Sequence, residues 1–234
     1  PSEKVSVRAE QTIMQYLAHQ PGGLTDLEYS INPRQSKRAR NWFRVDWNIS
    51  ALTIDIDISS RTKINCRNFA LYASRQSLGN LQSINRPDYG NARDLIKGNY
   101  LNFGNETRLI HRYTIKDRTS ALVTGVRFYR GHTNQQQGYS NSDTTGYLSD
   151  FEFVEPAQGI LQSDFVFPSF NFAFFAENFF SISDKFSITP GIRFEYIHTE
   201  ASGYYQDLVT VSTATGIDTI RNEAVSEQRS LGRP

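Results

Sequence analysis

The sequence predicts an all-β fold built from long antiparallel strands, and three observations support this prediction. Apolar and polar residues alternate with a period of two over most of the chain, as in strands with two different faces. Aromatic residues make up 13% of the 234 residues, and rings favour strands over helices. The longest unbroken apolar run, 172–176, is far shorter than the roughly 20 residues of a membrane-spanning helix.

The first strands are expected in the first third of the chain. A weaker strand over 5–18 is followed by an alternating run over 43–58, whose apolar residues occupy odd positions before Ala51 and even positions after it. A change of parity inside one run indicates a β-bulge. A turn near 60–61 then leads into a strand over 64–75.

Two hairpins are expected further along. Alternating residues over 107–115 and, less cleanly, over 122–128 flank a turn near 117–119. Apolar residues occupy even positions over both 166–182 and 186–196, on either side of a polar turn at 183–185. This spacing keeps all the apolar side chains of the second hairpin on one face.

The register of that second hairpin can be stated residue by residue. If Ile182 lies opposite Phe186, then Glu177 lies opposite Gly191 and diagonal to Arg193. We therefore expect an ion pair between Glu177 and Arg193. The same register places Phe170, Phe172 and Phe174 on the opposite face from Glu177, Arg193 and Glu195.

The connections alternate between short and long, and this indicates a transmembrane β-barrel. Short turns near 59–62, 117–119 and 183–185 separate stretches rich in Asn, Gly, Gln, Ser and Arg, which lie near 19–39, 76–104, 131–164 and 200–234. Outer-membrane barrels have short periplasmic turns and long extracellular loops. The expected strands, of about 10 to 18 residues, also exceed the roughly five or six residues usual in soluble proteins. We expect the long connections to share one rim.

The alternation of apolar and polar residues fits both a transmembrane barrel and a soluble sandwich. In a transmembrane barrel the apolar face meets lipid and the polar face lines the lumen, whereas in a soluble sandwich the apolar face covers a core. Continuous phenylalanines at 170, 172 and 174, charged residues at mid-strand and aromatic residues near strand ends favour the barrel. A soluble carbohydrate-binding β-sandwich remains an alternative.

The sequence offers no chemistry for an enzyme. It has no nucleophile elbow, phosphate-binding loop or zinc-protease motif, and its four histidines show no metal-ligand spacing. Cys66 is the only cysteine, which excludes an internal disulfide or a paired-cysteine metal site. The net charge of +1 gives no reason to expect a nucleic-acid partner. We expect no catalytic residue, no protein-bound metal and no cofactor.

Arginines gather in and beside the long connections. Arg34, Lys37, Arg38 and Arg40 fall close together, and Arg75, Arg86 and Arg93 lie in or beside the next long stretch. A guanidinium holds a carboxylate through two parallel hydrogen bonds. If the long connections share one rim, these cations line a mouth for an anionic ligand. The candidate ligand-binding residues are Arg38, Arg40, Arg75 and Arg93.

Several stretches resemble the barrel of TonB-dependent outer-membrane receptors, and in particular the ferric-dicitrate-receptor-like branch of Bacteroidetes-type bacteria. The resemblance covers about residues 5 to 205, and its most specific part is the Ala-Glu-Asn strand followed by the Thr-Pro-Gly-x-Arg-x-Glu strand. The matching stretches are 20–26, 40–43, 46–48, 73–79, 125–129, 175–178 and 188–196.

The resemblance implies a closed barrel of about 22 strands around a plug, energised by the TonB–ExbB–ExbD complex and importing a ferric chelate, either ferric dicitrate or a siderophore. Residues 1–234 would then be a partial barrel domain of about seven strands, with the plug, the N-terminal region that reaches TonB and the C-terminal strands outside it. The expected location is the outer membrane of a Gram-negative bacterium, in contact with its lipid. A passive porin is the alternative.

Overall fold

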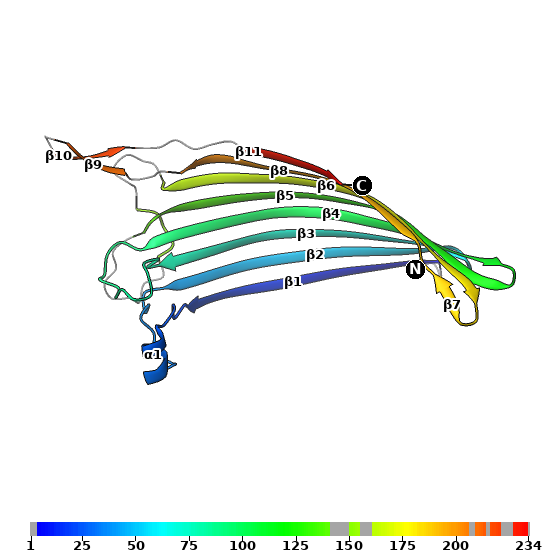
Figure 1. Ribbon diagram of the computed structural model, residues 1–234, viewed down its shortest axis with the longest axis horizontal. Helices are drawn as coiled ribbons and strands as arrows, with labels where there is room; N and C mark the ends of the chain where they lie inside the picture. Colours follow the sequence, from blue (N-terminus) through cyan, green and yellow to red (C-terminus); the bar gives the residue numbers. More distant parts are fainter. Residues whose placement is uncertain are drawn as a thin grey trace.

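The computed structural model describes residues 4–140, 150–154, 161–205, 209–213, 216–220 and 227–233, with side chains up to Tyr205. Figure 1 shows one curved sheet of long strands running side by side. The strands of this sheet are β1 (Val5–His19), β2 (Trp42–Ser59), β3 (Thr62–Gly79), β4 (Asp94–Ile115), β5 (Arg118–Tyr139), β6 (Ser163–Ser183), β7 (Phe186–Ile188), β8 (Gly191–Tyr205) and β11 (Glu227–Arg233).

Strands that follow one another in the chain are neighbours in the sheet. The order is β1-β2-β3-β4-β5-β6-β8-β11, with β7 also paired to β6, and every pairing is antiparallel. The short β7 lies directly before β8 and is separated from it at Pro190, which has no N–H to give to the ladder. A separate hairpin pairs β9 (Val209–Thr213) with β10 (Gly216–Ile220). The predicted all-β antiparallel fold is confirmed.

Short turns and long connections lie at opposite ends of the sheet. The turns at 60–61, 116–117 and 184–185 are at one end, and the connections at 20–41, 80–93 and 140–162 are at the other (Figure 1). Lys116 and Asp117 both have positive φ, at 44° and 63°, as a two-residue hairpin turn requires. The expectation that the long connections share one rim is confirmed.

The strands are longer than the sequence indicated. β4 and β5 contain 22 residues each, so the expected loops at 76–104 and 131–164 include strand residues at both of their ends. The expected long stretch at 200–234 also holds the end of β8 and all of β11, which pairs with β8. The sheet path therefore has eight strands and not seven.

The predicted bulge near Ala51 is wrong. The register runs without a break through this point, with Ala51 opposite Phe69, and the only irregularity between β2 and β3 lies between Asp57 and Ser59. Because the strand does not slip, the change of parity at Ala51 means that the two faces exchange their polarity along the strand.

We therefore divide the sheet at the row of paired residues Ala51, Phe69, Gly104, Tyr129 and Asn171. The turn half lies between this row and the short turns, and the loop half lies between it and the long connections. The Phe172 face carries the even-numbered residues of β2, β3, β5, β6 and β8 and the odd-numbered residues of β1 and β4. The Arg193 face carries the others.

In the turn half, the Phe172 face is apolar and exposed. Phe172 is 45% exposed and Phe194 is 47% exposed, and no second layer covers them among the described residues (Figure 1). Phe172 pairs with Tyr196 and Arg193 pairs with Phe175, so the prediction that Phe172 and Arg193 lie on opposite faces is confirmed. The other apolar side chains of this face include Leu52, Ile54, Ile56, Ile64, Leu109, Val126, Phe174 and Ile192.

In the loop half, the distribution on β2 is reversed. Arg44, Asp46 and Asn48 lie on the Phe172 face, while Val45 and Trp47 lie on the Arg193 face, where Val45 is only 4% exposed. The compact core is small and lies at the loop end on the Phe172 face. It consists of Leu78, Leu95 and Phe151, with Trp42 and Phe153 packed against them.

The connection between β1 and β2 contains a short helix that the sequence did not reveal, α1 (Asp26–Ile31). Thr25 and Glu28 cap its first turn reciprocally: the Thr25 backbone N–H donates to Glu28 Oε2 at 2.9 Å, and the Glu28 N–H donates to the Thr25 hydroxyl at 3.4 Å. In the part of the chain that the structure describes, no helix has the length and apolarity needed to cross a membrane.

Candidate functional site

Arg38 fastens the first long connection to the second. Its side chain is buried, at 4% exposure, and its Nη1 donates to the carbonyl of Arg86 at 3.1 Å. Its Nη2 donates to the carbonyls of Gln82 at 3.2 Å and Ser83 at 3.1 Å. The buried guanidinium thus finds its partners among backbone carbonyls of the 80–93 connection, which it joins to the 20–41 connection.

Arg40 makes a second link between the same connections. Its Nε and Nη2 donate to the two carboxylate oxygens of Asp88 at 2.9 and 2.6 Å, the bidentate geometry typical of strong arginine pairs. Burial raises the pKa of Asp88, but hydrogen bonds from Arg40, the Gly90 N–H and the Asn80 amide outweigh this effect and lower the pKa to about 2. Asp88 is therefore ionised at neutral pH.

Lys37 ties helix α1 to this assembly. Its Nζ donates to Glu28 Oε1 at 2.5 Å and to the Ile84 carbonyl at 3.0 Å. The Lys37 hydrogen bond, followed by those from Thr25, lowers the pKa of Glu28 to about 2. We call Arg38, Arg40, Asp88, Lys37 and Glu28 the loop clasp, because together they join the 20–41 and 80–93 connections.

The four candidate ligand arginines lie in two different environments. Arg38, Arg40 and Arg93 are buried at the rim, at 4%, 6% and 0% exposure, and Arg93 Nη1 donates to the Arg40 carbonyl at 3.4 Å. Arg75 is exposed in the loop half of the Arg193 face, between Val45 and Gly98 on its neighbouring strands. Ligand binding by the four stays a prediction. Among them, the placement favours Arg75.

A second group of arginines lies deeper on the same face, in the turn half. Arg67, Glu106 and Arg127 stand opposite one another on β3, β4 and β5. Arg108 Nε donates to Glu106 Oε1 at 2.6 Å, and Arg127 Nη1 lies 3.5 Å from Glu106 Oε2. These four residues, with Asn65 and Phe69, surround a hollow of about 380 Å³. We call Arg67, Glu106, Arg108 and Arg127 the arginine row.

The arginine row has three cations for one carboxylate, so it can attract an anion. Arg67 is exposed and takes part in no ion pair among the residues with described side chains. Sequence reasoning missed this group because Arg67, Arg108 and Arg127 were seen on separate strands. The sequence contained the information needed to find it, because a hairpin with a two-residue turn at 116–117 pairs Glu106 with Arg127.

The neighbouring charges on β8 pair within their own strand. Glu177 lies opposite Gly191, as predicted, but the predicted ion pair between Glu177 and Arg193 is wrong. Arg193 Nη2 donates to Glu195 Oε1 at 3.1 Å, and the Asn171 amide donates to the same oxygen at 2.8 Å. Two residues along one strand share a face, so Glu195 is as accessible to Arg193 as a diagonal partner.

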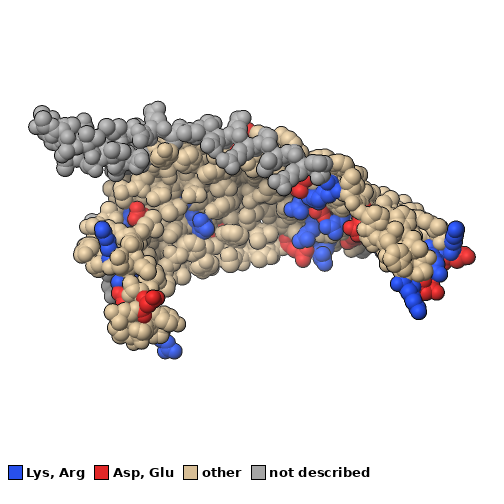
Figure 2. Space-filling view, in the orientation of Figure 1, with Lys and Arg blue, Asp and Glu red and all other residues tan. Residues whose placement is uncertain are grey.

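Figure 2 shows where charge gathers on the visible face of the molecule. Side chains of both signs form a group between the middle of the sheet and its turn end, and further charges lie at the loop end and at the hairpin tips. Most of the surface between the central group and the loop end is uncharged. The described residues contain no group of three or more His, Cys, Asp or Glu side chains placed to hold a metal ion.

Comparisons with known proteins identify the fold. No protein-family model matches the chain, and no curated protein matches it. Among solved structures, a crystal structure of the ferric citrate transporter FecA in its unliganded form matches all of this chain, with 20% sequence identity and a TM-score of 0.75. The chain spans 30% of the length of that structure. It therefore has the fold of a segment of that protein.

Proposed function

We propose that this chain is part of a TonB-dependent outer-membrane receptor that imports a ferric chelate through a β-barrel. The observation that carries the proposal is the separation of the two faces in the turn half. One face is a continuous exposed apolar surface, and the other carries the arginine row. A soluble sandwich would cover the apolar face with a second sheet, whereas a barrel wall leaves it to lipid.

Aromatic rings cross this face beside the row that divides the two halves. Phe103, Phe128, Phe170 and Tyr196 form a chain across β4, β5, β6 and β8, with ring centroids 5.8, 5.5 and 6.2 Å apart. They lie beside the row at which the polarity exchanges. Rings at this level resemble the aromatic girdles with which barrels meet the membrane interface.

The cargo is proposed to be an anionic ferric chelate, and the branch resembling ferric dicitrate receptors is the preferred assignment. Arg75 in the loop half and the arginine row in the turn half lie on one face, which would line the lumen. Cations along this face would raise the local concentration of an anion. The likeness to a ferric citrate transporter is consistent with citrate, and a siderophore is the second candidate ligand.

The test is uptake of radiolabelled ferric citrate by the intact protein in a Gram-negative host that lacks its own ferric citrate receptor. We expect uptake that saturates and that stops when an uncoupler collapses the proton gradient, because TonB delivers energy from that gradient. Uptake that continues in the presence of the uncoupler would instead indicate a passive porin.

Binding measurements on variants assign the residues. Arg75→Gln should weaken ferric citrate binding about tenfold, the loss expected for one hydrogen bond between charged partners. Lys185→Gln, at the opposite end of the sheet, is the matched control and should bind normally. Arg38→Ala is less informative, because Arg38 holds the rim connections together. Unchanged affinity in Arg75→Gln and in Arg67→Gln would contradict an anionic ligand on this face.

A further inference from the structure

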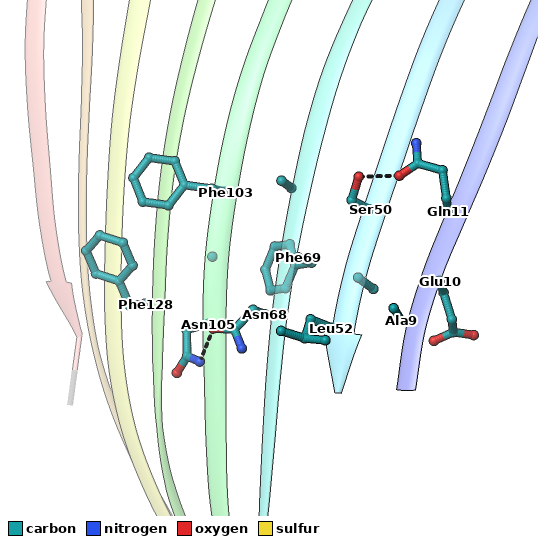
Figure 3. A pocket seen from close by; sticks show the side chains of 13 residues that line it. Ala9, Glu10, Gln11, Ser50, Leu52, Asn68, Phe69, Phe103, Asn105 and Phe128 are labelled. Atoms are coloured by element: carbon teal, nitrogen blue, oxygen red, sulfur yellow. Dashed lines mark hydrogen bonds between the residues drawn. The ribbon is translucent and has the colours of Figure 1, made fainter. Parts of the chain in front are cut away.

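The Phe172 face carries a groove where its polarity exchanges. The groove measures about 700 Å³, and Figure 3 shows its side chains from close by. Small residues on neighbouring strands, Ala9, Ser50 and Ala70, form a floor, and the rings of Phe103 and Phe128 rise at one side. Small side chains next to large ones on a pleated surface leave a hollow that the sheet itself does not fill.

Two pairs of polar side chains in this groove are engaged with each other, and Glu10, which also lines it, lies 3.5 Å from Arg8 Nε. The Asn105 amide donates to Asn68 Oδ1 at 2.8 Å, and the Ser50 hydroxyl donates to Gln11 Oε1 at 2.5 Å (Figure 3). The Asn105 carbonyl oxygen in turn accepts from the Thr107 hydroxyl at 3.0 Å. Since these donors are already used, the groove offers its occupant a mainly apolar surface.

A cation stands beside the ring wall of the groove. Arg130 lies directly opposite Phe103 on β4 and Phe170 on β6, and it is exposed. No carboxylate lies on the Phe172 face in the paired rows on either side of it on β4, β5 or β6. Glu200, on the more distant β8, is held by His198 at 2.6 Å.

The other cations of the Phe172 face in the loop half have partners. Arg44 lies 4.2 Å above the ring of Phe151. Lys97 lies 4.7 Å above the ring of Phe153 and 3.6 Å from a Glu152 carboxylate oxygen. The segment 150–154 thus covers these two. Among the Lys and Arg side chains described on this part of the face, Arg130 alone lacks a hydrogen bond or an ion pair.

We propose that the groove and Arg130 bind an anionic membrane lipid, with an acyl chain over Phe103 and Phe128 and the phosphate of the headgroup at Arg130. This inference rests on the proposed function, because it requires the Phe172 face to meet the bilayer. Arg130 lies in the row of Phe103 and Phe170, at the loop-side edge of the ring chain, which is the level of the headgroups if the rings mark the interface. A guanidinium is well suited to hold a phosphate.

The experiment uses the intact protein reconstituted in phosphatidylcholine vesicles. Phe103→Trp places an indole at the groove wall. Its fluorescence is obtained by subtracting the signal of the protein without this substitution, because the chain also contains Trp42 and Trp47. Quenching is compared between brominated phosphatidylglycerol, which is anionic, and brominated phosphatidylcholine. We expect about fivefold preference for the anionic lipid, the effect of one cation at a membrane surface. This preference should be lost in Arg130→Gln and kept in the matched control Arg44→Gln.

A second variant tests the groove separately from the charge. Ala70→Phe fills the floor but keeps Arg130, so quenching by brominated phosphatidylglycerol should fall. Unchanged quenching in this variant would contradict binding of the acyl chain in the groove. Equal quenching by both lipids when Arg130 is present would overturn the lipid site while leaving the proposed function intact. No quenching by either lipid would contradict contact of this face with the bilayer, and with it the proposed function.

Discussion

The turn half and the loop half of the sheet are made from the same strands, yet on β2 they use the two faces in opposite ways. In the turn half, Ile54 and Phe172 are on the apolar face and Arg193 is on the other. In the loop half, Arg44 occupies the face of Phe172, and Val45 is buried on the face of Arg193. Where a barrel strand extends beyond the bilayer, its outer face contacts water instead of lipid. The outer positions then favour polar residues, although the pairing register of the strand stays the same.

The two halves also differ in the interactions that stabilise them. In the turn half, the strands are joined by the backbone ladder and by contacts such as the one between Arg127 and Glu106. The loop half has a small core around Leu78 and Leu95, together with the loop clasp. The predictions that follow disturb one half while leaving the other intact.

The largest effect is expected from breaking the buried pair of the loop clasp. Arg40→Ala leaves the Asp88 carboxylate buried without its main partner, which costs about 3–5 kcal/mol. Hydrogen exchange in the intact protein should show faster exchange at residues 80–93 and no change in the turn half of β3. A double variant, Arg40→Met with Asp88→Leu, removes both charges and should recover much of the protection. Unaltered exchange at 80–93 in Arg40→Ala would show that the clasp does not order this connection.

A charge on the Phe172 face should destabilise only the turn half. Phe172→Arg is expected to lower the free energy of unfolding in lipid by about 2–4 kcal/mol if it lies near the bilayer midplane. Val166→Arg, on the same face and the same strand but in the loop half, is the control and should cost at most about 1 kcal/mol. The measurement is reversible denaturation in lipid vesicles. Equal losses of unfolding free energy in Phe172→Arg and Val166→Arg would contradict the difference between the two halves.

Acid should loosen the loop half by a smaller amount. Asp88 has a pKa of about 2 in the folded protein, against an ordinary value of 3.8, so the stability that it contributes is fully present above its unfolded pKa. It is lost as the pH falls through about 4 toward 2. Glu28 acts in the same direction. Exchange at 80–93, corrected for the intrinsic pH dependence of amide exchange, should rise over this range in the native protein. In Asp88→Asn, the exchange rate at 80–93 should rise less over this pH range. An unaltered pH dependence in this variant would exclude Asp88 as its cause.

Much of the fold could be predicted because alternation and turn composition are local properties. Glu177 was correctly placed opposite Gly191, since even-numbered residues must pair with even-numbered ones to keep the apolar side chains on one face. The expected pair of Ile182 with Phe186 is wrong, because an irregularity between Ser181 and Ser183 places Ser183 opposite Phe186. The polarity exchange at Ala51 was mistaken for a bulge because both produce the same change of parity. Only the partners of Ser50 and Leu52 on β3 distinguish them.

The candidate site was less predictable, because it depends on contacts between strands and between loops. Arg38 looks like a ligand arginine in the sequence, and nothing local reveals that carbonyls more than 40 positions away take its donors. The arginine row required the pairing of β3, β4 and β5. Arg75 lies exposed on β3, and its role in ligand binding stays a prediction.

The proposed barrel requires that one continuous strand, β2, meet lipid on its even-numbered residues only from Leu52 onward. Nitroxide labels placed one at a time along β2 of the intact protein in lipid vesicles test it through collision rates with oxygen and with a water-soluble nickel chelate. We predict preferential collision with oxygen at 52, 54 and 56, and with the nickel chelate at 44, 46 and 48. Preferential collision with oxygen at 43, 45 and 47 would contradict the claim, because the lipid-facing side would then change parity at Ala51, as a bulge requires.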